Sequence, residues 1–130
     1  MQIYLDFDGT VVEHYYPLIG SPNPGCEEVI SALQKKGYEI VLNTYRVEIE
    51  DNSLQEAIAY LNQLDLFQKI QLKTTQKIQP HPWDVNKAFK IGSLYLDDIA
   101  EGIPLIDAPV SSGKMVDWVK IGMQLKGNFY

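Results

Sequence analysis

The sequence predicts an α/β protein with a doubly wound parallel sheet, formed by a single domain over residues 1–130. Short apolar runs typical of strands alternate along the chain with segments of helical periodicity. Polar residues follow these runs where they end, which is where open α/β sheets bind ligands. With 130 residues, the chain is long enough for one compact core.

The first predicted strand begins at Ile3 and is apolar on both faces, as is typical of a buried strand in a parallel sheet. Asp6 and Asp8 stand where this strand ends. Gly9 lets the chain turn sharply, because glycine tolerates dihedral angles that other residues avoid. We therefore expect Asp6 and Asp8 at the mouth of a site, with the amides of Gly9 and Thr10 beside them as substrate-binding groups.

The segment after this strand, residues 11–25, is rich in Pro and Gly but also contains Val, Ile and Tyr. This mixture indicates an ordered flap beside the site. A helix is predicted over residues 27–36, where apolar side chains share one face. The second strand is predicted over residues 38–43 and ends at Thr44, and Arg46 follows two residues later.

The middle of the chain contains weaker signals. A helix is predicted to begin at Asn52 or Ser53, because both are good capping residues. A short third strand is predicted within residues 67–72, and a short helix over residues 82–89, opened by a proline. These elements complete the alternation of strands and helices.

The fourth predicted strand covers residues 94–96 and ends in Asp97 and Asp98. A short fifth strand is predicted over residues 103–106, and a closing helix over residues 115–125. The apolar residues expected to form one face of that helix are Val116, Val119 and Met123.

Right-handed crossovers place the carboxyl ends of parallel strands at one edge of a sheet. We therefore expect four carboxylates, Asp6, Asp8, Asp97 and Asp98, to converge there with Thr44. Like charges a few ångströms apart repel one another, and a divalent cation relieves the repulsion. Oxygen ligands favour Mg²⁺, and the chain has no Cys/His spacing typical of zinc sites.

The string from Asp6 to Thr10, Asp-Phe-Asp-Gly-Thr on an apolar strand, resembles the first motif of the haloacid dehalogenase (HAD) superfamily of aspartate-nucleophile phosphatases. Thr44 and the pair Asp97–Asp98 match the positions of two later motifs of that family. The resemblance covers most of the chain and implies a Rossmann-like, HAD-like fold. It also implies a hydrolase that acts on a phosphomonoester, with a small phosphorylated metabolite as its partner.

The resemblance implies a role for each matched residue. Asp6 would be the nucleophile that forms an aspartyl phosphate, and Asp8 would protonate the leaving oxygen and later deprotonate water. Thr44 and a lysine would hold phosphate oxygens. Mg²⁺ would be held by Asp6, by the Asp8 backbone carbonyl, and by Asp97 with or without Asp98.

Three lysines lie between the second and last motifs: Lys77, Lys87 and Lys90. We favour Lys77, because it follows the third predicted strand near the edge where the acids emerge. A helix over residues 82–89 would carry Lys87 and Lys90 towards the far edge of the sheet. If that stretch is instead an extended loop, Lys87 or Lys90 would reach the site.

Family members often carry a cap domain, for which neither residues 11–37 nor residues 45–93 leave room beyond their predicted elements. The chain therefore resembles a small capless subgroup with a Glu-His pair after the first motif. On this basis Glu13, His14 and Arg46 are candidates for substrate contacts.

Composition narrows the function further. The net charge is −6 without a basic run, so we expect no nucleic-acid binding. Cys26 is the only cysteine, which excludes an intrachain disulfide and suits a reducing cytoplasm. Without a signal peptide or a long apolar run, we expect a cytoplasmic protein with no membrane association. The sequence does not determine the oligomeric state.

Two other functions remain open on the same fold. Response-regulator receivers also combine an acid pair, Mg²⁺, a Thr and a Lys, but their phosphorylated Asp ends the third strand. Here the third predicted strand ends in Lys73 and Thr74, without an Asp. The other alternative is a catalytically silent binding domain that retains the fold.

Overall fold

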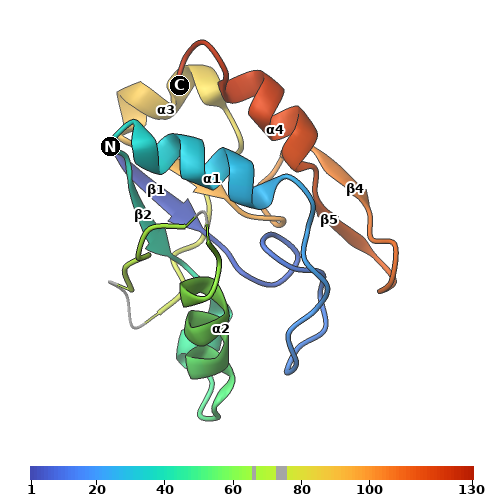
Figure 1. The fold of residues 1–130 in the computed structure, drawn as a ribbon. Helices are drawn as coiled ribbons and strands as arrows, with labels where there is room; N and C mark the ends of the chain where they lie inside the picture. The colour runs from blue at the N-terminus through green and yellow to red at the C-terminus, as the bar shows by residue number, and fades with distance from the viewer. Residues whose placement is uncertain (66, 73–75) are drawn as a thin grey trace.

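A parallel sheet of three strands lies at the centre of the fold (Figure 1). The structure is a computed structural model that describes residues 1–65, 67–72 and 76–130. The strands are β1 (Gln2–Leu5), β2 (Glu39–Leu42) and β3 (Ser93–Leu96), in the order β2-β1-β3. In register, Ile3 of β1 pairs with Ile40 of β2 and Leu94 of β3. The predicted α/β class is confirmed.

The central position of β1 follows from its composition. Ile3 and Leu5 are fully buried, and Tyr4, on the other face, stacks on Tyr95 of β3 with ring centroids 4.9 Å apart. Phe7 continues the apolar run beyond the strand and is also fully buried. Because apolar side chains leave β1 on both faces, this strand gains most from a place between two others.

The helices are α1 (Cys26–Lys35), α2 (Ser53–Asn62), α3 (Val85–Ile91) and α4 (Trp118–Leu125), with a 3₁₀ helix, η1 (Tyr45–Glu48), after β2. Helices α1 and α4 lie side by side and pack against each other (Figure 1). The helices predicted near residues 27 and 53 are confirmed. Within the described residues, no helix has the length and apolar character needed to cross a membrane.

Helix α3 begins three residues later than predicted. The Asp84 carboxylate accepts hydrogen bonds from the Asn86 and Lys87 amides at 3.0 and 3.1 Å, which makes Asp84 the N-terminal cap. A capped start outweighs the preference of Pro82 for the first turn of a helix. Gly92, in the left-handed region, ends the helix just before β3.

The C-terminal part of the chain differs from the prediction. The expected fifth strand does not join the main sheet: β4 (Leu105–Asp107) pairs antiparallel with β5 (Lys114–Val116) in a separate hairpin. Residues 114–116, partly predicted as helix, form a strand instead. Asp117 then caps α4, because its carboxylate accepts a hydrogen bond from the Lys120 amide at 3.2 Å.

The predicted apolar face of the closing helix is wrong. Val119 and Met123 are 67% and 73% exposed, whereas Trp118, Ile121 and Leu125 are buried. The indole of Trp118 donates a hydrogen bond to the Thr10 carbonyl at 2.7 Å, beneath the loop that follows β1. Burying this large side chain sets the rotation of α4, and the smaller Val119 and Met123 face solvent.

The third predicted strand is reduced to one bridge in the described residues. Gln71 pairs in parallel with Val41, on the side of β2 away from β1. The chain therefore passes outside β2 before it returns to β3 on the other side of β1. The predicted end of that strand at Lys73 and Thr74 lies outside the described residues.

Candidate functional site

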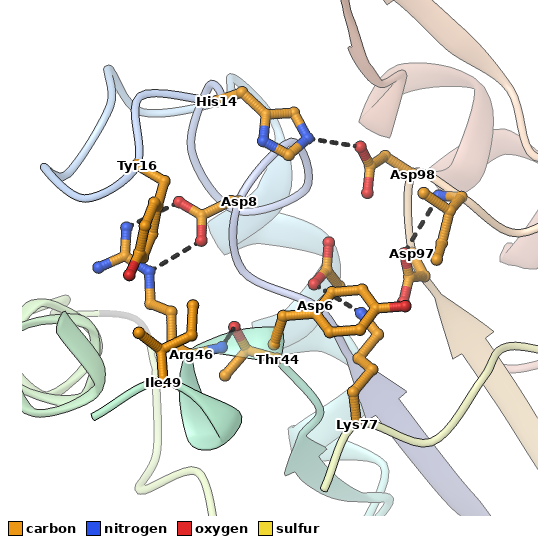
Figure 2. Close-up of a pocket in the computed structure, with 12 residues that line it drawn as sticks. Asp6, Asp8, His14, Tyr16, Thr44, Arg46, Ile49, Lys77, Asp97 and Asp98 are labelled. Atoms are coloured by element: carbon orange, nitrogen blue, oxygen red, sulfur yellow. Dashed lines mark hydrogen bonds and ion pairs between the residues drawn. The ribbon is translucent and has the colours of Figure 1, made fainter. Parts of the chain in front are cut away.

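A cavity of about 260 Å³ opens where the strands β1, β2 and β3 end (Figure 2). Its walls come from the ends of the strands, the flap (residues 11–25), η1 and the segment before α3. The residues that line it are Asp6, Asp8, His14, Tyr16, Thr44, Tyr45, Arg46, Ile49, Lys77, Asp97, Asp98 and Ile99. Candidates from distant parts of the sequence therefore share one cavity.

Lys77 is buried between two carboxylates. Its Nζ donates a hydrogen bond to Asp6 Oδ1 at 2.9 Å and lies 2.6 Å from Asp97 Oδ2. The second contact is an ion pair without hydrogen-bond geometry, so the buried Asp97 Oδ2 has no hydrogen-bond partner among the described residues. Lys77 thus places a positive charge directly beside the predicted nucleophile, Asp6.

The backbone around Lys77 is held by residues that follow β2. The Asn43 side chain accepts a hydrogen bond from the Ile78 amide at 2.8 Å and donates one to the Ile78 carbonyl at 2.9 Å. The Glu48 carboxylate accepts from the Lys77 amide at 2.9 Å. Lys87 and Lys90, the other two candidates, are exposed on α3 and do not line the cavity.

Charge and burial act together on the buried groups. Burial raises the pKa of Asp6 well above its usual value, and the charge of Asp97 adds to this rise while Lys77 opposes it. The pKa of Asp97 is also raised by burial, against the effect of Lys77. Burial alone would lower the pKa of Lys77, but the charges of Asp6 and Asp97 outweigh it and raise that pKa. One ammonium thus faces an excess of carboxylates.

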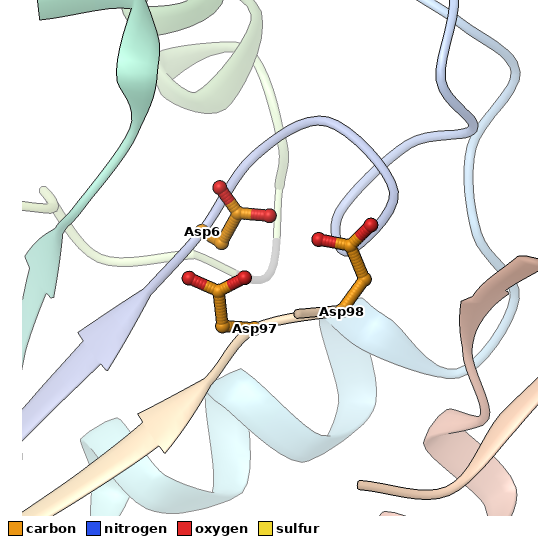
Figure 3. A group of neighbouring side chains, drawn as sticks. All are labelled: Asp6, Asp97 and Asp98. Carbon is orange, nitrogen blue, oxygen red and sulfur yellow. The ribbon is translucent and has the colours of Figure 1, made fainter. Parts of the chain in front are cut away.

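Three carboxylates form a group that suits a divalent cation. One oxygen each from Asp6, Asp97 and Asp98 lies within 4.8 Å of the other two, and the carboxylates face one another (Figure 3). These hard oxygen donors are the ligands that Mg²⁺ prefers. The expected convergence of four carboxylates is confirmed, because Asp8 lines the same cavity, but its side chain lies outside this group of three.

Asp8 is instead held by Arg46, a residue of η1. Arg46 Nη2 donates to Asp8 Oδ1 and Nε to Oδ2, both at 2.8 Å, in a two-pronged ion pair (Figure 2). The remaining N–H groups donate to the carbonyls of Pro17, Leu18 and Ser53. The guanidinium has five N–H donors, and all five have acceptors. Arg46 therefore has no free donor for a substrate, contrary to its expected role as a substrate contact.

The loop after Asp8 supports Asp6 and Asp98 through hydrogen bonds, and its amides are not open to a substrate. The Gly9 amide donates to the Val12 carbonyl at 2.8 Å, and the Thr10 amide to the Phe7 carbonyl at 3.2 Å. Neither amide is therefore available to a substrate, contrary to expectation. The buried Thr10 hydroxyl donates to Asp6 Oδ2 at 2.9 Å and accepts from the Asp98 amide at 3.2 Å.

Gly9 is needed because the backbone at this position lies close to the side chains of His14 and Asp98. Its φ of +80° lies in the left-handed region, and a Cβ there would collide with His14 and Asp98. His14 Nε2 lies 2.8 Å from Asp98 Oδ2, and its side chain is half exposed at the cavity rim. The hydrogen bond to Asp98 raises the pKa of His14. For Asp98, burial raises the pKa, but the bond from His14 and further hydrogen bonds lower it overall.

Glu13 does not line the cavity. Its Oε1 accepts hydrogen bonds from the amides of Val110 and Ser111 at 3.0 and 2.8 Å, and from the Ser111 hydroxyl at 3.0 Å. The bond from the Ser111 amide is the main reason that the pKa of Glu13 is lowered. Glu13 therefore connects the flap to the β4–β5 hairpin, and its expected role as a substrate contact is corrected.

Thr44 lies two residues after the end of β2 and lines the cavity, as predicted. It is almost fully buried, and its hydroxyl accepts a hydrogen bond from the Arg46 amide at 3.2 Å, which caps η1. The hydrophobic part of the wall was not predicted from the sequence: Tyr16, Tyr45, Ile49 and Ile99. Their only sequence signal is closeness to predicted site residues, because neither the flap nor η1 has the periodicity that assigns a side chain to a face.

No family model matches this sequence, and no curated protein matches it. Among solved structures, the chain is similar to one described as a conserved protein from Bacteroides thetaiotaomicron, with 25% identity and a TM-score of 0.53. The similarity covers 97% of this chain and 89% of that chain. This likeness over nearly the whole chain supports the α/β fold, and the description of that protein names no activity.

Proposed function

We propose that the protein is a Mg²⁺-dependent phosphatase that hydrolyses a small phosphomonoester through a covalent intermediate on Asp6. The proposal includes a doubly wound, HAD-like sheet without a cap domain. The observation that carries it is the setting of Asp6: a buried carboxylate that contacts Lys77 and Thr10 and lies beside Asp97 and Asp98. Such a setting places one ammonium and several metal-binding oxygens around one potential nucleophile.

The metal would be held by Asp6, Asp97 and Asp98, whose oxygen donors fit Mg²⁺. A bound Mg²⁺ would offset the negative charge of the phosphate. Lys77 supplies the other positive charge, and its ammonium already lies 2.9 Å from Asp6 Oδ1. Phosphoryl transfer depends mainly on such alignment and charge neutralisation.

The bonds that form and break in the covalent steps involve the two aspartates, the phosphomonoester and water. An oxygen of Asp6 forms a bond to phosphorus while the bond from phosphorus to the alcohol oxygen breaks, and Asp8 gives that oxygen a proton. Water then attacks phosphorus, passes a proton to Asp8 and releases Asp6 and inorganic phosphate. The proton that Asp8 takes from water replaces the one that it gives in the first step, and Arg46 orients the Asp8 side chain through two hydrogen bonds.

Asp6→Asn provides the direct test. Turnover of p-nitrophenyl phosphate with Mg²⁺ should fall by at least about 1,000-fold, since the nucleophile is lost while the shape is kept. Asp107→Asn, in the exposed β4–β5 hairpin, is the matched control and should keep full activity. Substantial turnover by a folded Asp6→Asn protein would contradict the mechanism.

The same assay separates the alternative functions. A phospho-accepting regulatory domain would incorporate phosphate from a small donor without sustained release. A catalytically silent binding domain would do neither. We also propose a cytoplasmic location, since the only cysteine, Cys26, is a buried free thiol. The proposed partner is a small phosphorylated metabolite.

A further inference from the structure

The rim of the cavity is apolar, although its floor is charged. Four hydrophobic residues form this apolar rim: Tyr16, Tyr45, Ile49 and Ile99. They are 41%, 45%, 41% and 51% exposed, in that order, and all four line the cavity. They come from the flap, from η1 and the residue after it, and from the turn after β3, so the rim is assembled from three parts of the chain.

The polar ends of the two tyrosines are engaged elsewhere. The Tyr16 hydroxyl donates a hydrogen bond to Asp51 Oδ2 at 2.6 Å, and the Tyr45 hydroxyl accepts one from Gln79 at 2.7 Å. Their rings also cover cations: the Arg46 guanidinium lies 5.2 Å from the Tyr16 ring centroid, and the Lys77 ammonium 4.9 Å from that of Tyr45. Tyr16 and Tyr45 therefore contribute mainly ring surface to the rim.

The cations that line the cavity already have partners. Lys77 contacts Asp6 and Asp97, the donors of Arg46 are all used, and His14 pairs with Asp98. Among the described lining residues, none offers a free cation to a second anionic group. A carboxylate or second phosphate at the rim would therefore lose water without gaining an unpaired cation among these residues.

We infer that the substrate is a phosphomonoester whose alcohol part is uncharged and apolar, with an aromatic ring preferred. This inference rests on the proposed function and names the substrate class. The phosphate would enter the charged floor near Asp6 and Lys77, and the ring would lie between Tyr16, Ile49 and Ile99. A cavity of about 260 Å³ suits a single ring with short substituents.

Two synthetic substrates isolate this property. The phosphate esters of 3-(4-hydroxyphenyl)propionic acid and of its methyl ester differ by a carboxylate far from the phenol, so the phenol leaving groups are nearly equal. With Mg²⁺ present, kcat/KM should be at least about tenfold higher for the methyl ester. Equal values, or a higher value for the carboxylate, would overturn this inference and leave the proposed function intact.

Variants then assign the preference to the rim. Ile99→Asn should lower kcat/KM for the methyl ester about fivefold and reduce its advantage over the carboxylate. Inorganic phosphate should inhibit this variant as well as it inhibits the unaltered protein, because the floor is unchanged. Ile91→Asn is the matched control: Ile91 is 48% exposed, close to the 51% of Ile99, but lies at the end of α3.

The outcomes are distinct. An Ile91→Asn effect as large as that of Ile99→Asn, or no effect of Ile99→Asn on the ratio of the two substrates, would overturn the assignment to the rim. If neither ester nor p-nitrophenyl phosphate is hydrolysed with Mg²⁺, the proposed function itself fails, and this inference with it.

Discussion

Arg46 should be the residue on which the site's architecture depends most. It is 1% exposed, and its guanidinium connects Asp8 to the flap, through Pro17 and Leu18, and to the start of α2, through Ser53. Arg46→Met keeps the apolar stem but removes every one of these hydrogen bonds and the contact of the guanidinium with the Phe7 ring. The change therefore tests the network without opening a large cavity.

The expected loss follows from what is left behind. Removing one partner of a buried ion pair costs about 3 to 5 kcal/mol, because the other charge stays buried without compensation. The Asp8 side chain is 13% exposed, so water can solvate it in part and the lower end of that range applies. A loss of about 3 kcal/mol is a large share of the roughly 5 to 15 kcal/mol typical of a domain. For 130 residues it corresponds to a Tm about 10 °C lower.

Thermal melts followed by circular dichroism give the measurement. Lys114→Met is the matched control, since Lys114 pairs with Asp107 while the two side chains are 61% and 83% exposed. Its effect should stay within about 0.5 kcal/mol. Arg46→Lys restores the charge but not the planar fork, so its Tm should fall between the other two. An Arg46→Met protein that melts within about 3 °C of the unaltered chain would refute the network described above.

Three further predictions concern the floor of the cavity and the core. Lys77→Met should lower phosphatase turnover about a hundredfold, while Lys87→Met leaves it unchanged, and comparable kcat values for both variants would contradict the assignment of the lysine. Millimolar Mg²⁺ should raise the Tm, and combining Asp97→Asn with Asp98→Asn should abolish that rise; a rise that persists in the double variant would place the metal elsewhere. The Cys26 thiol should not react with a disulfide reagent until the protein unfolds, because it is buried and burial raises its pKa; rapid modification in native buffer would show that the core opens readily.

Local patterns in the sequence determined the framework of the fold. The apolar run from Ile3 to Phe7 predicts a buried strand because its side chains leave both faces, and the structure places β1 at the centre of the sheet. The helix predicted over residues 27–36 and the strand over residues 94–96 match α1 and β3 to within a residue or two. The positions of Asp6 and Asp97 at the cavity follow directly, because the carboxyl ends of parallel strands meet at one edge.

The closing hairpin and helix show where local patterns mislead. Val116, Val119 and Met123 have helical spacing, yet Val116 belongs to β5 and the other two side chains face solvent. Spacing shows only that residues can share a face. Which face is buried depends on the neighbours, here on the burial of Trp118 beneath the loop after β1. That contact joins residues 108 positions apart, so no local window contains it.

Only the tertiary structure decided which side chains meet at the site. Lys77 reaches Asp6 across 71 positions because Asn43 and Glu48 hold its backbone, a restraint that no run of residues around Lys77 indicates. Arg46 had the right position for a substrate contact, but its donors are used by Asp8 and by backbone carbonyls. The physical reason is general: strand and helix formation depends on near neighbours, whereas the partner of a charged side chain depends on what the whole fold brings within about 3 Å.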